Sequence, residues 1–202
     1  MDPYLLINKV KSVLTDPLNF FDHLKKETGI KTAFTYFFFL SLISTILGFI
    51  VGLLFQDYYS YLLRQIIGFA LPKPEYTIGM LLVSYGSTIL ASFVITGILH
   101  VWILIFGGKE NYSKTYQLYV YSTTPTFAVG WIPFVGSLAW FYNVVLLIIG
   151  TQRVHNISKV KSILMYTIPV ILMGLFFLVI VIFSLFILRE NPNLFQNFIP
   201  PQ

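Results

Sequence analysis

The residue types that most often carry chemistry are few in this chain, and they lie outside its long apolar stretches. None of the eight acidic residues falls inside such a stretch, and no two are spaced to act as acid and base in a sheltered pocket. The three histidines show no metal-ligand spacing, and there are no cysteines. Nucleophile-elbow, zinc-protease and phosphate-loop motifs are also missing from the sequence. We therefore expect no enzyme activity, no cofactor and no metal.

One polar pattern stands out within an apolar stretch, because a polar side chain recurs at every fourth position. On an α-helix each such step advances about 40° around the axis, which makes a slanted stripe. Two interpretations stay open: close helix packing with hydroxyls bonded to the backbone, or a hydrated path or lipid-headgroup groove ending at a titratable histidine. The second would make the protein a small-solute or ion transporter. The stripe consists of Ser84, Thr88, Ser92, Thr96 and His100.

The composition defines the environment that holds these residues. Of the 202 residues, 56% are hydrophobic and 10% are charged, against about 25% charged in a soluble domain. Mean hydropathy is +0.78. So few charges cannot cover a soluble globule, which excludes a soluble enzyme, a disordered chain and a nucleic-acid binder. The sequence predicts an integral membrane protein.

The apolar stretches predict an all-α, polytopic membrane helical bundle, since a spanning helix needs about 20 mostly apolar residues. Proline and glycine break the chain at residues 130–136, which predicts a tight hairpin between the third and fourth helices. The alternative, one kinked helix over 116–151, would be some 54 Å long and too long for one crossing. The five expected spans are residues 34–55, 77–106, 116–132, 133–151 and 162–188.

The distribution of lysine and arginine sets the expected orientation. Ten of these residues lie before the first span, between the second and third spans, or between the fourth and fifth spans, which all face the same side of the membrane. The other three lie on the opposite side. Because cytoplasmic loops carry the excess of positive charge, we expect a cytoplasmic N-terminus and an outside C-terminus. Residues 189–202 then form an extracytoplasmic tail.

The N-terminal segment, residues 1–33, predicts two short helices on the cytoplasmic side. Asp2-Pro3 and Asp16-Pro17 each pair an N-cap acid with a proline in the first turn. Apolar residues opposite lysines suit an interfacial helix on anionic lipid, or a helix that packs on the cytoplasmic face of the bundle. The candidate contacts for anionic lipid or a protein partner are Lys9, Lys11, Lys25, Lys26, Arg153, Lys159 and Lys161.

Two further features concern helix packing. Gly48 and Gly52 form a GxxxG pattern in the first span, which marks close helix crossing and offers one route to a homodimer. Asn143 is expected to bond within the bundle. Pro125 removes a backbone hydrogen bond that neighbouring hydroxyls can replace.

From Phe106 the chain reads FGGKENYSKTYQLYVYSTTPTFAVGWIPFVGSLAWFYNVVLLIIGTQRVHNISKVKSI, which resembles the Yip domain family of Ypt/Rab-interacting membrane proteins and their prokaryotic relatives. The resemblance implies five spans with a cytoplasmic N-terminus and, for eukaryotic members, Rab GTPase binding in traffic between endoplasmic reticulum and Golgi. The matching residues are Gly107, Gly108, Tyr121, Ser122, Pro125, Ile132, Pro133, Gly136, Gly150 and His155.

The chain departs from the eukaryotic pattern in its short N-terminal region and in having no close match to an Asp-Leu-Tyr-Gly-Pro segment. It is therefore similar to a prokaryotic-type member, for which Rab binding does not carry over. We expect a multi-pass protein, in the plasma membrane of a prokaryote or the endoplasmic reticulum or Golgi of a eukaryote. Its expected role is a non-enzymatic scaffold that engages lipid or an unidentified protein partner. A lipid-directed enzyme is a weaker alternative with no candidate nucleophile.

Overall fold

The structure, a computed structural model, describes residues 2–67 and 76–190. Within these ranges the ordered elements are all α-helices. Asp2 and Asp16 cap the first two helices as expected, accepting from the backbone N–H of Tyr4 and Asn19. The helices are α1 (Pro3–Thr15), α2 (Pro17–Leu24), α3 (Lys31–Ile67), α4 (Ile78–Ile105), α5 (Tyr112–Ser122), α6 (Thr124–Val129), α7 (Val135–His155) and α8 (Lys159–Glu190).

Four of these helices are long and apolar enough to cross a membrane. They correspond to the first, second, fourth and fifth expected spans. The helix α3 continues to Ile67, well past the expected end of the first span at Phe55, and its candidate span ends at Tyr58. The tail expected over 189–202 lies outside the described residues from position 191 on.

The third span expected over residues 116–132 is not a single helix. That segment forms α5 and α6, of 11 and 6 residues, and each is shorter than the roughly 20 residues that a crossing needs. Pro125 lies in the first turn of α6 and has no N–H to donate to the carbonyl of Tyr121, so the helix is interrupted at Thr123.

The expected hairpin over residues 130–136 is present between α6 and α7. Pro133 lies in this turn, where its carbonyl accepts from Val135 N–H, and Gly136 N–H donates to the Ile132 carbonyl. A Cβ on Gly136 would lie 2.5 Å from the Gly130 carbonyl oxygen. Only glycine therefore allows the turn to close this tightly.

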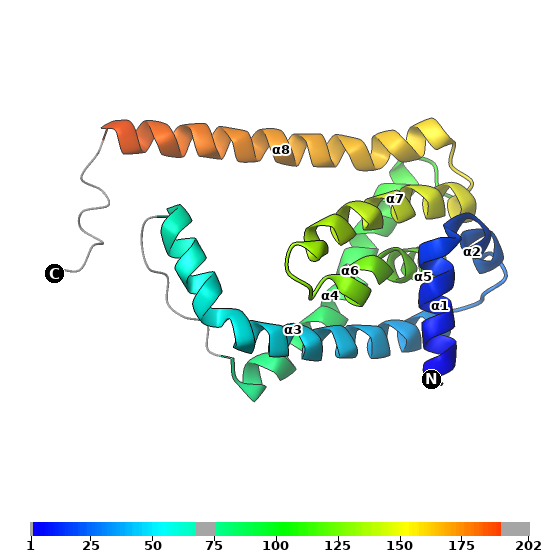
Figure 1. The fold of residues 1–202 in the computed structure, drawn as a ribbon. Coiled ribbons are helices and arrows are strands. Elements are labelled where there is room, and N and C mark those ends of the chain that lie inside the picture. Colours follow the sequence, from blue (N-terminus) through cyan, green and yellow to red (C-terminus); the bar gives the residue numbers. More distant parts are fainter. Residues whose placement is uncertain (1, 68–75, 191–202) are drawn as a thin grey trace.

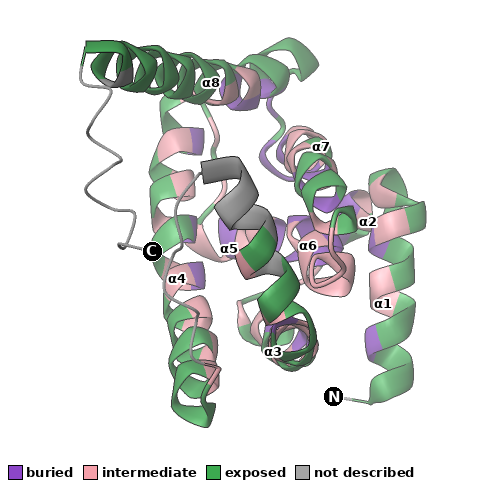
Figure 2. Ribbon diagram, turned by 60° about the vertical axis from the view of Figure 1, so that its left-hand side comes forward, coloured by how far each residue is buried: buried purple, intermediate pink, exposed green. Residues whose placement is uncertain are grey.

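The molecule has a compact part and a protruding part. The helices α1, α2, α5, α6 and α7 pack together, α4 runs obliquely behind them, and α3 and α8 extend away in the same direction (Figure 1). Buried residues gather in the compact group, whereas most of α8 is exposed (Figure 2). The fully buried side chains include Val13, Phe21, Phe37, Tyr116, Leu118 and Leu146. Burial of these apolar groups holds the compact part together.

A close approach at Gly150 joins three helices in this compact part. A Cβ there would lie 2.9 Å from Cε1 of Phe21 in α2 and would also meet the Leu118 side chain of α5. The missing side chain on α7 is therefore what lets α2 and α5 pack directly on its backbone.

Candidate functional site

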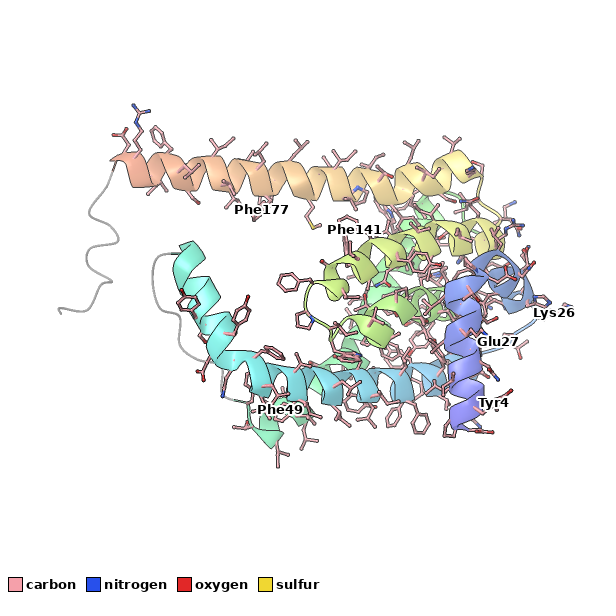
Figure 3. All side chains as sticks on the ribbon, in the orientation of Figure 1. Tyr4, Lys26, Glu27, Phe49, Phe141 and Phe177 are labelled. Carbon is pink, nitrogen blue, oxygen red and sulfur yellow. The ribbon has the colours of Figure 1, made fainter. Side chains whose placement is uncertain are left out.

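The most connected polar group is a cluster of Lys9, Glu27 and Tyr121, which we call the Lys9 cluster. Lys9 Nζ lies 3.3 Å from Glu27 Oε2 and donates to the Tyr121 hydroxyl at 2.6 Å. The Tyr121 hydroxyl donates to Glu27 at 2.9 Å, and Lys9 Nζ also lies 4.6 Å from the centre of the Tyr121 ring. Figure 3 labels Glu27 beside α1. The cluster ties α1 to α5 and to the segment that leads into α3.

Two further side chains of α5 bind the backbone of that same segment. Lys114 Nζ donates to the carbonyls of Leu24 at 2.7 Å and Glu27, and Gln117 Nε2 donates to the Gly29 carbonyl at 2.6 Å. The Lys114 ammonium thus supplies a hydrogen-bond donor to carbonyls at the C-terminal end of α2 that would otherwise lack one. Burial lowers the pKa of the Lys114 ammonium from its ordinary value, and the carboxylates of Glu110 and Glu27 oppose that shift.

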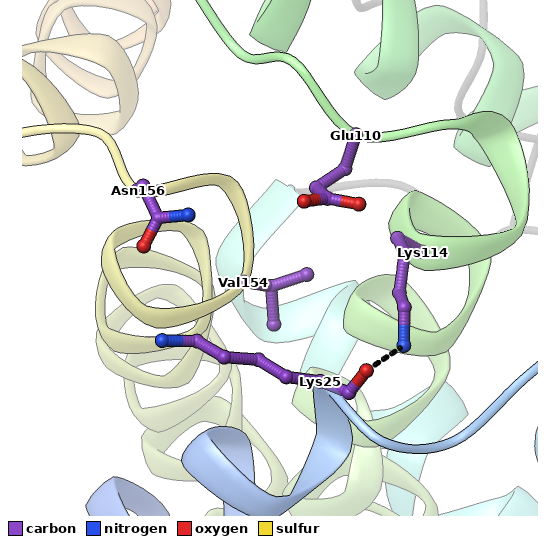
Figure 4. Close-up of a pocket in the computed structure, with 5 residues that line it drawn as sticks. All are labelled: Lys25, Glu110, Lys114, Val154 and Asn156. Atoms are coloured by element: carbon purple, nitrogen blue, oxygen red, sulfur yellow. Dashed lines mark hydrogen bonds between the residues drawn. The ribbon is translucent and has the colours of Figure 1, made fainter.

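A small cavity of about 100 Å³ lies next to Lys114 and is lined by Lys25, Glu110, Val154 and Asn156. Lys114 also lines the cavity, and Figure 4 shows its ammonium directed to the Lys25 carbonyl, 3.0 Å away. Lys25 Nζ itself lies 3.6 Å from Asp22. Because both cations are already engaged, the cavity does not offer an anion a free pair of charges.

A second polar group joins α4, α5 and α7 through two histidines. Thr115 Oγ1 lies 2.8 Å from His100 Nδ1 and 3.3 Å from His155 Nε2. His155 is buried and its Nδ1 has no hydrogen-bond partner. If neutral His155 donates from Nε2 to Thr115, the Thr115 hydroxyl can donate to His100, and the unpartnered Nδ1 is then an acceptor, the less costly atom to leave unpaired.

The predicted polar stripe of α4 divides between exposed and buried positions. Ser84 is exposed, while Ser92 and Thr96 are fully buried. The hydroxyls of Thr88 and Thr96 donate to carbonyls one turn earlier in the same helix, at 2.9 and 2.6 Å. Ser92 donates to Ile89 and lies 3.4 Å from the Tyr116 hydroxyl. The polar groups of the stripe thus find most of their hydrogen-bond partners within α4 and on α5.

The seven candidate lipid or partner contacts fall into two groups. Lys9 is engaged in the Lys9 cluster, and Lys25 and Arg153 both pair with Asp22, the latter at 3.2 Å. The remaining four are exposed and form no ion pair within the described ranges. These four are Lys11, Lys26, Lys159 and Lys161.

The motif residues lie at packing contacts. The Asn143 amide bridges α7 to the break at Pro125; with its oxygen accepting from Thr126 Oγ1, its nitrogen donates to the Ser122 carbonyl at 3.1 Å. Pro125 is buried. A Cβ on Gly48 would lie 3.9 Å from Trp131, and one on Gly52 would lie 2.6 Å from Cζ of Tyr76. Both glycines of the GxxxG pattern therefore lie against side chains of this same chain.

Sequence reasoning missed Glu27, Lys114, Thr115 and Gln117 as site residues. One available signal was the spacing of Lys114, Gln117 and Tyr121, which places three polar groups on one face of a helix. Glu27 carried no signal of its own, because its partners lie 18 and 94 residues away.

Long apolar helices around buried polar clusters define a multi-pass α-helical membrane protein. The match of a family model described as the Yip1 domain, over residues 11–181, shows that the chain belongs to the Yip1 domain family. This confirms the resemblance found from the sequence. No curated protein and no solved structure matches the chain.

Proposed function

We propose that the protein is a non-enzymatic membrane scaffold whose basic end binds anionic lipid headgroups. By basic end we mean the end formed by α1, α2, the starts of α3, α5 and α8, and the C-terminal ends of α4 and α7. The observation that carries the proposal is the contrast among its lysines: Lys9 and Lys114 hold α1 and α2 in place, while Lys11, Lys26, Lys159 and Lys161 stay exposed.

The exposed side of α1 fits an interfacial position. Tyr4, Leu5 and Ile7 are exposed, and Figure 3 shows Tyr4 near the free end of this helix. Its opposite side, with Leu6 and Val13, is buried against the bundle. A helix fixed in this way can insert apolar side chains at the headgroup level without being free to leave the protein.

We also propose five crossings with the N-terminus in the cytoplasm. Gly108, just after α4, packs against His155 at the end of α7. Since α7 has 21 residues and a length of about 30 Å, the chain from Gly108 to Val135 has to travel from the basic end to the other end of α7. The pair α5 and α6 then acts as a broken third crossing, and the charge bias sets the orientation.

The absence of cysteine allows a direct test of this topology. Ser12→Cys and Glu190→Cys variants are placed in sealed vesicles of known protein orientation and treated with a membrane-impermeant maleimide. Five crossings predict labelling of the two positions from opposite sides. Labelling of both from one side would contradict the odd number of crossings.

The lipid proposal is tested with the full chain in nanodiscs of phosphatidylcholine and phosphatidylserine. Changing the four exposed lysines to glutamine should reduce phosphatidylserine enrichment around the protein, since each lysine near an anionic surface contributes about 1 kcal/mol. Arg189→Gln, at the far end of α8, is the control and should leave enrichment unchanged. Equal enrichment for the quadruple variant and the wild type would exclude the basic end as the lipid contact.

Transport along the stripe of α4 is the less supported alternative. The buried hydroxyls of Ser92 and Thr96 are bonded to their own helix, and His100 is bonded to Thr115. A partner protein at the basic end, including a small GTPase by family analogy, is compatible with the scaffold role.

A further inference from the structure

We propose that a groove between α4, α7 and α8 holds one acyl chain of a membrane phospholipid. The groove encloses about 600 Å³, within the range of sites that bury small ligands. Its walls include Ile98 and Trp102 from α4, Trp140 and Val144 from α7, and Met165 and Val170 from α8. This site is separate from the basic end, and the proposal does not depend on the one made for that end.

A specific hydrogen bond of Trp102 joins two walls of the groove. Pro169 has no N–H, so the Met165 carbonyl lacks the donor that an uninterrupted α8 would supply four residues later. Trp102 Nε1 donates to this carbonyl instead, at 3.1 Å. The indole thus joins α4 to α8 at the place where the proline leaves an acceptor unpaired.

A second bond beside it joins α8 to α7. The hydroxyl of Tyr166 lies 2.7 Å from Thr151 Oγ1, and both residues are buried. Together the two bonds fix the spacing of α4, α7 and α8. They also satisfy polar groups next to the groove. The remaining lining is almost entirely apolar, which disfavours water and polar ligands as occupants.

The dimensions favour a hydrocarbon chain over a helix of a second copy. All three walls belong to candidate membrane spans, so the groove opens into lipid. Along α8 it reaches only from Met165 to Met173, about 12 Å. A transmembrane helix would need a face of about 30 Å, whereas one acyl chain fits a short slot.

The first experiment measures retained lipid by native mass spectrometry of the full chain after delipidation in detergent. Wild type should keep one phospholipid per chain. Val170→Phe, which fills the groove, should retain about tenfold less, because the chain loses its apolar contacts. Val179→Phe places the same change on an exposed part of α8 and should retain as much lipid as wild type. Equal retention by the two variants, or a dimer without lipid, would overturn the proposal.

The second experiment leaves Val170 in place and so does not depend on the folding of Val170→Phe. Single-tryptophan variants that keep Trp102 or Trp140 are reconstituted with a trace of phosphatidylcholine brominated either mid-chain or near the chain end. Bromine on the bound chain should quench Trp102 and Trp140 more strongly than it quenches a tryptophan outside the groove. A variant that keeps Trp131, which packs against Gly48 outside the groove, should show only the quenching of bulk lipid. Quenching of Trp102 at the bulk level for both lipids would refute a bound chain.

Discussion

The compact group of α1, α2, α5, α6 and α7 and the protruding residues 171–187 of α8 are both rich in apolar side chains, yet they obtain stability differently. In the compact group, apolar residues are buried and polar bonds join segments far apart in sequence. In α8 the same kinds of residue are exposed along the helix, as Phe177 shows in Figure 3. Hydropathy alone therefore does not separate a helix that packs on protein from one that needs lipid around it.

The difference gives each region its own sensitivity to mutation. A change in the compact group alters protein–protein contacts and should lower the free energy of unfolding. A change in residues 171–187 alters only the contact with lipid or detergent. Four pairs of substitutions test this difference, and in each pair a contact in the compact group, or its junction with α8, is compared with a matched exposed position.

The largest contrast is expected between two leucines. Leu118→Ala removes a fully buried side chain and should cost about 3 kcal/mol. Leu175→Ala, at a side chain that is 53% exposed, should change the free energy of unfolding by less than about 0.5 kcal/mol. Unfolding in mixed micelles, followed by circular dichroism, measures both. Equal costs would mean that α8 packs on protein in the membrane.

The next contrast uses two helical glycines. Gly150→Ala places a methyl group against Phe21 and Leu118 and should cost about 2 kcal/mol. Gly174→Ala meets no atom within 4 Å and should be neutral or slightly stabilising. Thermal melting in one detergent compares them. A neutral Gly150→Ala would show that α2 can shift away from α7 at little cost.

Two lysines of α1 give the third contrast. Lys9→Met leaves Glu27 without its cation and should cost about 1.5 kcal/mol, less than for a fully buried pair because both side chains are about 20% exposed. Lys11→Met changes an exposed lysine and should have little effect. The double variant Lys9→Met with Glu27→Gln should recover part of the loss in an unfolding titration. Equal effects for Lys9→Met and Lys11→Met would rule out a structural role for the Lys9 cluster.

The smallest contrast concerns the junction between the two regions. Trp102→Phe removes the indole donor and leaves the Met165 carbonyl unpaired, at a cost of about 1 kcal/mol. Trp140→Phe is the control, because the Trp140 indole donates no hydrogen bond within residues 2–67 and 76–190 and is 40% exposed. Hydrogen exchange at the start of α8 should increase for Trp102→Phe alone. Unchanged exchange there would show that the bond does not hold α8.

Local patterns in the sequence predicted much of the fold. The caps at Asp2 and Asp16, the turn around Pro133 and four long apolar helices follow from neighbouring residues. At residues 116–132 the sequence predicted a span kinked at Pro125. The helix is instead interrupted, and Asn143, from another helix, satisfies the exposed backbone.

The candidate site was less predictable than the fold. Lys9 was expected to face lipid, as its place in an amphipathic helix suggests, but its ammonium is bonded to Tyr121, 112 residues away. Lys11 is the same residue type two positions further along the same helix, and it is exposed. Periodicity cannot distinguish two lysines whose roles depend on which distant residue lies opposite.

The sequence by itself determined that this chain is an all-helical membrane protein of the Yip1 domain family, because hydropathy, loop charge and short motifs are local properties. Only the tertiary structure decided which polar residues are engaged, that both glycines of the GxxxG pattern lie against side chains of the same chain, and that Trp102 completes the backbone bonding of α8 at Pro169. The physical reason is that a buried polar group must find a partner wherever the fold provides one, and that partner can lie on any helix.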